Sequence, residues 1–169
     1  MSNKKFVKDI MFEIFEYPHI PYWFNIEQVI KVIKAFFIQT QKYTEPLVVL
    51  VFDEKYNLLG TVTPRDVLKK LKLSLPIEIN KEEPMAWDSF FSQEIKKIIH
   101  KPVSEIMVPA KHFVEPSDPV IKAAYLMISY DLAVLPVIRE KKKLLGLVRI
   151  VEVFDVISEE LLKNRSNFY

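Results

Sequence analysis

The tetrapeptide Thr63-Pro64-Arg65-Asp66 has the clearest chemical potential in the chain, because it separates an apolar run from a predicted helix over Pro64 to Leu71. A carboxylate at the start of a helix can accept charge-assisted hydrogen bonds from both hydroxyls of a ribose. The free N–H groups and positive dipole end of that helix suit a phosphate. Thr63 and Asp66 also have the spacing of a capping box, which needs no ligand. The two interpretations are compatible.

A related tetrapeptide, Arg149-Ile150-Val151-Glu152, follows 86 residues later. In it a guanidinium replaces the threonine hydroxyl and a longer acid replaces aspartate. Arg149 is either a surface strand residue or a side chain that projects into a cleft toward a phosphate, for which its permanent charge and fixed donors are suited. Glu152 could still reach a ribose. We therefore predict one intact site, centred on Asp66, and one degenerate site.

Both tetrapeptides belong to an internal repeat. Val7-Lys8-Asp9-Ile10-Met11 recurs as Val103-Ser104-Glu105-Ile106-Met107 at an offset of 96 residues. Leu59-Gly60 recurs as Leu145-Gly146 at an offset of 86 residues, and these are the only two glycines in the chain. The ten-residue difference between the offsets predicts a longer first helix in copy one.

Each copy is predicted to run strand, helix, strand, strand, helix, an α/β (α+β) fold of two tandem β-α-β-β-α repeats. In copy one the expected elements are a helix from Ile26 to about Tyr43, strands Leu47 to Phe52 and Leu58 to Thr63, and a helix from Pro64 to Leu71. In copy two they are a helix from Val120 to about Tyr130, strands Val134 to Ile138 and Leu144 to Ile150, and a helix from Val151 to about Leu162. We expect residues 1–72 to form repeat 1, 73–100 a structured linker with a helix over Ala86 to Ile99, 101–163 repeat 2, and 164–169 a tail.

Composition removes several classes of function. The 169 residues are half apolar and include no cysteine, which excludes disulfides, thiolate metal sites and a cysteine nucleophile. The apolar stretches are too short to span a bilayer and no secretory signal is evident, so we expect a cytoplasmic protein with no membrane partner. The net charge is only +2, and the one dense basic run, Lys141 to Lys143, is interpreted as a solvated hairpin turn. Both features argue against binding of nucleic acid. The three histidines are widely separated, and no catalytic or metal-binding motif is visible.

The chain resembles the CBS-domain family, whose pattern is an opening Val-x-Asp-Ile-Met, a central Leu-Pro-Val strand and a closing Gly-x-x-Thr-x-x-Asp. Copy two has Leu135-Pro136-Val137, and copy one has Gly60-Thr61-Val62-Thr63-Pro64-Arg65-Asp66. Copy one departs from the pattern in Glu45-Pro46-Leu47-Val48-Val49 and in an aromatic opening segment from Phe12 to Trp23. The resemblance covers residues 5–72 and 101–163.

The resemblance implies a Bateman module, two repeats related by a pseudo-two-fold axis, which binds AMP, ADP or ATP between the repeats and commonly forms a homodimer. Such a module is regulatory and not an enzyme, needs no catalytic cofactor, and would here act on an unknown protein in trans. The family places the base in an apolar slot, for which the candidates are Ile10, Met11, Tyr43 and Leu47, with contributions from Lys111, His112 and Phe113. Ordinary core or surface roles stay open for each of them.

A second hypothesis is a structural dimerisation or partner-docking module that has lost its ligand. The degenerate Arg149 motif and the aromatic first repeat motivate it. We interpret the aromatic cluster as core or dimer interface, with base stacking as the alternative; its members are Phe12, Phe15, Tyr17, Tyr22, Trp23 and Phe24.

Overall fold

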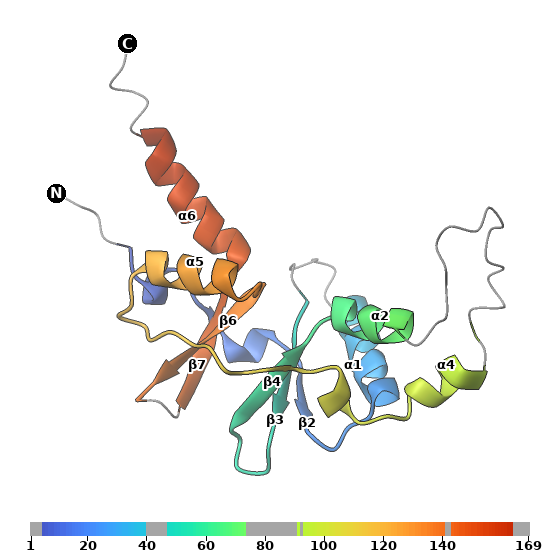
Figure 1. The fold of residues 1–169 in the computed structure, drawn as a ribbon. Coiled ribbons are helices and arrows are strands. Elements are labelled where there is room, and N and C mark those ends of the chain that lie inside the picture. The colour runs from blue at the N-terminus through green and yellow to red at the C-terminus, as the bar shows by residue number, and fades with distance from the viewer. Residues whose placement is uncertain (1–4, 40–46, 74–90, 92, 141–142, 164–169) are drawn as a thin grey trace, which may run out of the picture. The chain divides into compact units, whose positions relative to one another are not determined.

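The computed structural model describes residues 5–39, 47–73, 91, 93–140 and 143–163, which form two structural units (Figure 1). The Asp66 unit comprises residues 17–109, and the Arg149 unit comprises residues 1–16 together with 110–169. The boundaries of these units differ from those of the sequence repeats, because the opening segment of each copy belongs to the unit that holds the body of the other copy.

The Asp66 unit contains a four-stranded sheet in the order β2-β3-β4-β5. Its elements are β2 (His19–Pro21), α1 (Ile26–Gln39), β3 (Val49–Phe52), β4 (Leu58–Val62), α2 (Pro64–Leu73), α4 (Gln93–Ile98), the 3-10 turn η3 (Val103–Glu105) and β5 (Val108–Pro109). Helix α1 connects β2 to β3, and these two strands are parallel, whereas β3, β4 and β5 pair antiparallel.

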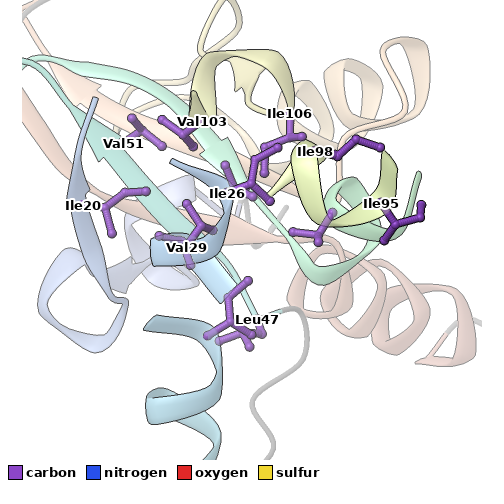
Figure 2. Packing of buried hydrophobic residues seen from close by; sticks show 13 residues of the cluster. Ile20, Ile26, Val29, Leu47, Val51, Ile95, Ile98, Val103 and Ile106 are labelled. Atoms are coloured by element: carbon purple, nitrogen blue, oxygen red, sulfur yellow. The ribbon is translucent and has the colours of Figure 1, made fainter. Parts of the chain in front are cut away.

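The core of the Asp66 unit forms where α1 and the second repeat's opening segment meet the sheet (Figure 2). All four residues of β3 are buried, which explains why its sequence is a continuous apolar run and does not alternate between apolar and polar residues. Helix α1 contributes Ile26 and Val29, and the opening segment of copy two contributes Val103 and Ile106. The core of this unit therefore depends on residues nearly 80 positions apart in the chain.

The Arg149 unit repeats this plan. Its elements are η1 (Val7–Asp9), β1 (Phe12–Glu13), η2 (Ile14–Glu16), α5 (Val120–Ser129), β6 (Val134–Arg139), β7 (Lys143–Arg149) and α6 (Ile150–Lys163). The sheet order is β1-β7-β6, with antiparallel pairs. Val114 adds a parallel bridge to Val137 at the position that β2 occupies in the other unit.

The exchanged opening segments are fixed by equivalent hydrogen bonds in the two units. The N–H of Val7 donates to the carbonyl of Asp118 at 2.9 Å, and the N–H of Val103 donates to the carbonyl of Phe24 at 2.9 Å. Val7 and Val103 are both fully buried. Each opening segment therefore anchors on the residues just before the first long helix of the other copy.

The predicted helices and strands of the described residues are observed with small boundary shifts. Asn25 and Gln28 form the reciprocal bonds of a capping box before α1, both at 2.9 Å. Helix α1 has 14 residues and α5 has 10, which confirms the longer first helix in copy one. The helix predicted over Ala86 to Ile99 is observed as α4 within the described residues. Tyr43, Trp87 and Lys141 lie outside the described residues.

None of the described helices has the length and apolar character required to cross a bilayer.

Candidate functional site

The Thr63 to Asp66 turn forms a complete capping box at the start of α2. The backbone N–H and the hydroxyl of Thr63 both donate to Oδ2 of Asp66, at 2.7 and 2.8 Å, and the N–H of Asp66 lies 3.3 Å from Oγ1 of Thr63. Pro64 is the first helical residue, where its missing N–H costs nothing. The capping interpretation is confirmed, and it engages only one carboxylate oxygen: Oδ1 of Asp66 accepts no hydrogen bond from any described residue.

A pocket of about 330 Å³ opens beside Asp66, entirely within the Asp66 unit. This volume is at the lower end of the range of roughly 300 to 1,000 Å³ that holds small molecules. Its lining is Asp66, Lys69, Lys70, Glu105, Ile106, Met107, Val108 and Pro109. The pocket therefore combines the acidic start of α2, two cations one turn further along the helix, and an apolar wall from the opening segment of copy two.

Gly60 makes this wall possible. Strand β5 pairs with β4 so that Val108 faces Thr61 and Pro109 faces Gly60. A Cβ atom at position 60 would collide with the side chain of Met107 and the carbonyl oxygen of Val108. Glycine thus allows the second opening segment to approach β4 closely, and this approach brings Met107 to the pocket that Asp66 lines.

The charges around the pocket favour an anion near its lysines. Nζ of Lys70 lies 3.8 Å from Oε2 of Glu105, which Lys101 also approaches at 3.8 Å. Lys69 is exposed at the pocket wall, and Arg65 is exposed in the first turn of α2. The N-terminal end of α2 adds the partial positive charge of its unpaired N–H groups.

The predicted base slot is divided between the two units. Ile10 and Met11 pack against the core of the Arg149 unit, and Leu47 is buried in the core of the Asp66 unit. Lys111 and His112 belong to the Arg149 unit, where the imidazole of His112 stacks on Tyr130 with ring centroids 3.6 Å apart. The predicted slot residues are therefore not all part of one unit, and Tyr43 lies outside the described residues.

Two apolar residues that line the pocket with Asp66 are the equivalents, in copy two, of residues predicted for the base slot. Ile106 and Met107 stand 96 positions after Ile10 and Met11. The predicted Ile10 and Met11 pack against the core of the Arg149 unit, whereas Ile106 and Met107 line the pocket of the Asp66 unit. The offset between the repeats was the signal that could have found them.

The equivalent place in the Arg149 unit is filled by the protein's own side chains. Nε of Arg149 donates to Oε2 of Glu152 at 2.9 Å, and the terminal nitrogen of Arg149 pairs with Oε1 of the same carboxylate. The guanidinium carbon lies 3.9 Å from the centre of the Phe12 ring. Arg149 is only 8% exposed, so it is not a surface strand residue. Phe12 corresponds by the repeat offset to Val108, which lines the pocket of the other unit.

We expect removal of either partner of the Arg149–Glu152 pair to destabilise the protein, and removal of both to cost much less. Arg149→Met leaves the half-buried carboxylate of Glu152 without its cation, and a loss of about 2 to 3 kcal/mol in unfolding free energy follows. Urea unfolding of Arg149→Met, Glu152→Leu and the double variant measures the coupling between the two side chains. Additive losses in the double variant would contradict this account of the pair.

The described part of the chain contains no group of three or more histidine, cysteine, aspartate or glutamate side chains that could hold a metal ion.

The chain thus consists of two α/β units of similar topology, each completed by the opening segment of the other repeat. Residues 103–159 match the family model of the CBS domain. This match confirms the resemblance for the second copy.

Solved CBS-pair structures have the same fold. The cytosolic domain of the Mg²⁺ channel MgtE in complex with ATP is 23% identical, with a TM-score of 0.59 over 92% of this chain and 50% of that chain. CBSX2 in complex with AMP is 19% identical, with a TM-score of 0.60 over 91% of this chain and 96% of that chain. The CBS-pair protein CBSX2 from Arabidopsis thaliana is 18% identical, with a TM-score of 0.64 over 96% and 99% of the two chains. This chain thus spans half of the MgtE domain that it matches. No curated protein sequence matches this chain significantly.

Proposed function

We propose that this protein is a non-catalytic regulatory module that binds an adenine nucleotide, AMP, ADP or ATP, in the pocket beside Asp66. The observation that carries the proposal is the pocket itself, where a carboxylate with one uncommitted oxygen, an exposed lysine and an apolar wall meet. The structural neighbours with ATP and AMP bound support it.

Each part of a nucleotide has a partner of suitable chemistry in this pocket. Oδ1 of Asp66 accepts hydrogen bonds from the ribose hydroxyls while Oδ2 keeps its bonds to Thr63. The phosphates lie toward the N-terminus of α2 and Lys69, where positive charge gathers. Met107 and Val108 offer an apolar surface to the base. The pocket thus distinguishes the ends of the ligand by charge.

Regulation requires that the nucleotide bind one conformation of the module more tightly than another. The shift in the conformational equilibrium can be no larger than the difference in binding free energy between the two states. The regulated protein acts in trans in this proposal. We assign no catalytic step to any residue of the pocket.

A thermal unfolding series tests the proposed ligand. A nucleotide that binds only the folded state raises the unfolding free energy by about 2.7 kcal/mol at a concentration one hundred times its dissociation constant. We expect AMP, ADP or ATP to raise the melting temperature with increasing concentration, and S-adenosylmethionine and GTP serve as comparison ligands. An unchanged melting temperature with all adenine nucleotides would count against the proposal.

An apolar face on α5 and α6 supports homodimer formation as part of the proposed function. Three large side chains of α5, at i, i+4 and i+7, are exposed, and α6 exposes a similar row; they are Ile121, Tyr125, Ile128, Val151, Phe154 and Leu161. Exposed apolar patches on two packed helices mark protein interaction sites. A second copy of this chain is the partner that we propose.

We expect Phe154→Asp to convert the dimer to a monomer. Phe154 is 70% exposed in the single chain, so an aspartate there disturbs little in the folded unit but places a charge within the proposed interface. Size-exclusion chromatography with light scattering gives the mass of each variant. Leu68→Asp, at an apolar residue of α2 that is 63% exposed, is the matched control and should stay dimeric; a monomeric wild type would exclude the interface.

A ligand-free dimerisation or docking module is the second candidate. The apolar face of α5 and α6 and the filled position at Arg149 favour it, because neither needs a nucleotide. A stable dimer whose melting temperature does not respond to any adenine nucleotide would support this alternative over the first.

A further inference from the structure

A second pocket of the Asp66 unit lies at the hairpin end of its sheet. Its volume is about 320 Å³, and its lining is His19, Ile20, Pro21, Trp23, Phe52, Asp53, Glu54 and Tyr56. Asp53 and Tyr56 precede β4, whereas Asp66 follows it, so the length of this strand separates the two pockets by roughly 15 Å. The two pockets share no lining residue.

Aromatic rings form much of this hairpin-end pocket. The ring of Phe52 lies 5.2 Å from that of His19 and 6.0 Å from that of Tyr56. Trp23 is 63% exposed and Tyr56 is 80% exposed, although both are large rings that proteins ordinarily cover. The pocket therefore offers aromatic faces to a ligand from solvent.

The backbone of Tyr56 shows that this ring stands at an unfavourable position. Its φ angle is +62°, in the left-handed region that glycine and asparagine adopt much more readily. The turn is closed by the N–H of Tyr56, which donates to the carbonyl of Asp53 at 3.1 Å, and it needs no aromatic side chain for this bond. Such strained residues concentrate at functional sites.

The pocket also carries the negative charges of Asp53 and Glu54, both of which accept hydrogen bonds from the protein. Asp53 accepts a hydrogen bond from the side-chain amide of Asn57 at 2.9 Å and bonds from the backbone N–H groups of Asn57 and Lys55, each at 2.8 Å. These bonds lower the pKa of Asp53, and the bond from the Asn57 side chain has the largest effect. Oε1 of Glu54 accepts the hydroxyl of Tyr22 at 2.7 Å, and this bond raises the pKa of Tyr22. Lys55 belongs to the same turn but does not line the pocket.

These features select one class of ligand. Aromatic faces and carboxylates attract a positive charge. Asp53 already accepts three hydrogen bonds from its own turn and has little capacity left for the N–H donors of an ammonium or guanidinium group, and the aromatic rings offer such donors no carboxylate oxygen. A quaternary ammonium has charge without such donors, and its methyl groups pack on aromatic rings. We propose that the hairpin-end pocket binds the quaternary ammonium group of a small molecule of the choline class.

The test measures fluorescence from Trp23 alone. The chain has two tryptophans, so Trp87→Phe leaves Trp23 as the single reporter in the full-length protein. We titrate this variant with choline chloride, with its uncharged isostere 3,3-dimethylbutan-1-ol and with methylguanidinium chloride, each at constant ionic strength. Choline should give a saturable change, and both comparison compounds should bind roughly tenfold more weakly or less.

Two further variants assign the effect to the pocket. Tyr56→Asn keeps a residue that tolerates the left-handed backbone and removes the ring, and it should weaken choline binding by roughly fivefold or more. Phe15→Leu, at an exposed aromatic of the Arg149 unit, should leave binding unchanged. The absence of a saturable change, equal binding of the uncharged isostere or of methylguanidinium, or undiminished binding by Tyr56→Asn would overturn the proposal.

Discussion

Valine at position 146 is expected to detach β1 from β7 and to lower the unfolding free energy by roughly 3 kcal/mol or more, since overpacking alone commonly costs about 1 to 3 kcal/mol. Glu13 pairs with Gly146, and a Cβ atom at this position would meet the carbonyl group of Phe12 and the Cα of Glu13. These are backbone atoms, which cannot rotate away as a side chain could. Neither of the described glycines has a positive φ angle. Glycine is therefore required at position 146 because the neighbouring backbone leaves no room for a Cβ atom, and not because of an unusual backbone conformation.

Urea unfolding of Gly146→Val measures this loss. A total stability of about 5 to 15 kcal/mol is usual for a domain, so the expected cost is a large share of it. Lys143→Val, at an exposed position of the same strand, is the matched control and should change stability by less than about 0.5 kcal/mol. Equal unfolding midpoints for Gly146→Val and the wild type would show that β1 is not held against β7 in solution.

Asparagine at position 66 is expected to weaken nucleotide binding by roughly 100-fold, because hydrogen bonds to a charged group contribute about 1.5 to 3 kcal/mol each. The substitution removes the charge that strengthens the bonds to both ribose hydroxyls. The amide oxygen of asparagine can still accept the bonds from Thr63, so most of the capping function is kept. Any loss of stability should stay near the roughly 1 kcal/mol of a helix cap.

Asp9→Asn separates the capping effect from the ligand effect. Oδ2 of Asp9 accepts the N–H of Phe6 at 2.9 Å, the same i to i+3 bond that Asp66 accepts from Thr63, but Asp9 lies in the Arg149 unit. We expect Asp9→Asn to bind nucleotide like the wild type. Equal losses of affinity in both variants would show that the Asp66 effect is a general consequence of a weakened cap.

The local elements were predictable because their signals lie in adjacent residues. The apolar spacing from Ile26 onward predicted α1, and the Asn25 and Gln28 pair predicted its start. The capping box at Thr63 was predicted for the same reason. Helix periodicity and capping depend on side chains three or four positions apart, and a single sequence contains that information.

The exchange of opening segments was not predictable from these signals. The 3-10 turns at Val7 and Val103 have the same residue pattern, so nothing local decides which copy each one completes. Pairing β5 with β4 and β1 with β7 is a long-range choice. For this reason Ile10 and Met11 are the candidates that the sequence suggests for the apolar slot, whereas Ile106 and Met107 line the pocket within the Asp66 unit.

The burial of Arg149 was also missed, for a physical reason. An arginine that ends a strand and precedes a helix ordinarily stays in water, since removing its charge from water is costly. Here Glu152 and the Phe12 ring compensate that cost together. The i to i+3 spacing of arginine and glutamate was visible in the sequence, but Phe12 lies more than 130 positions away.

Isothermal titration of AMP and of ATP into the wild type, Asp66→Asn and Asp9→Asn tests the Asp66 site most directly. The account predicts saturable binding of at least one of these nucleotides to the wild type and to Asp9→Asn, with one site per chain. Asp66→Asn should bind it roughly 100-fold more weakly. No heat of binding with the wild type, or equal affinity in Asp66→Asn, would contradict the account.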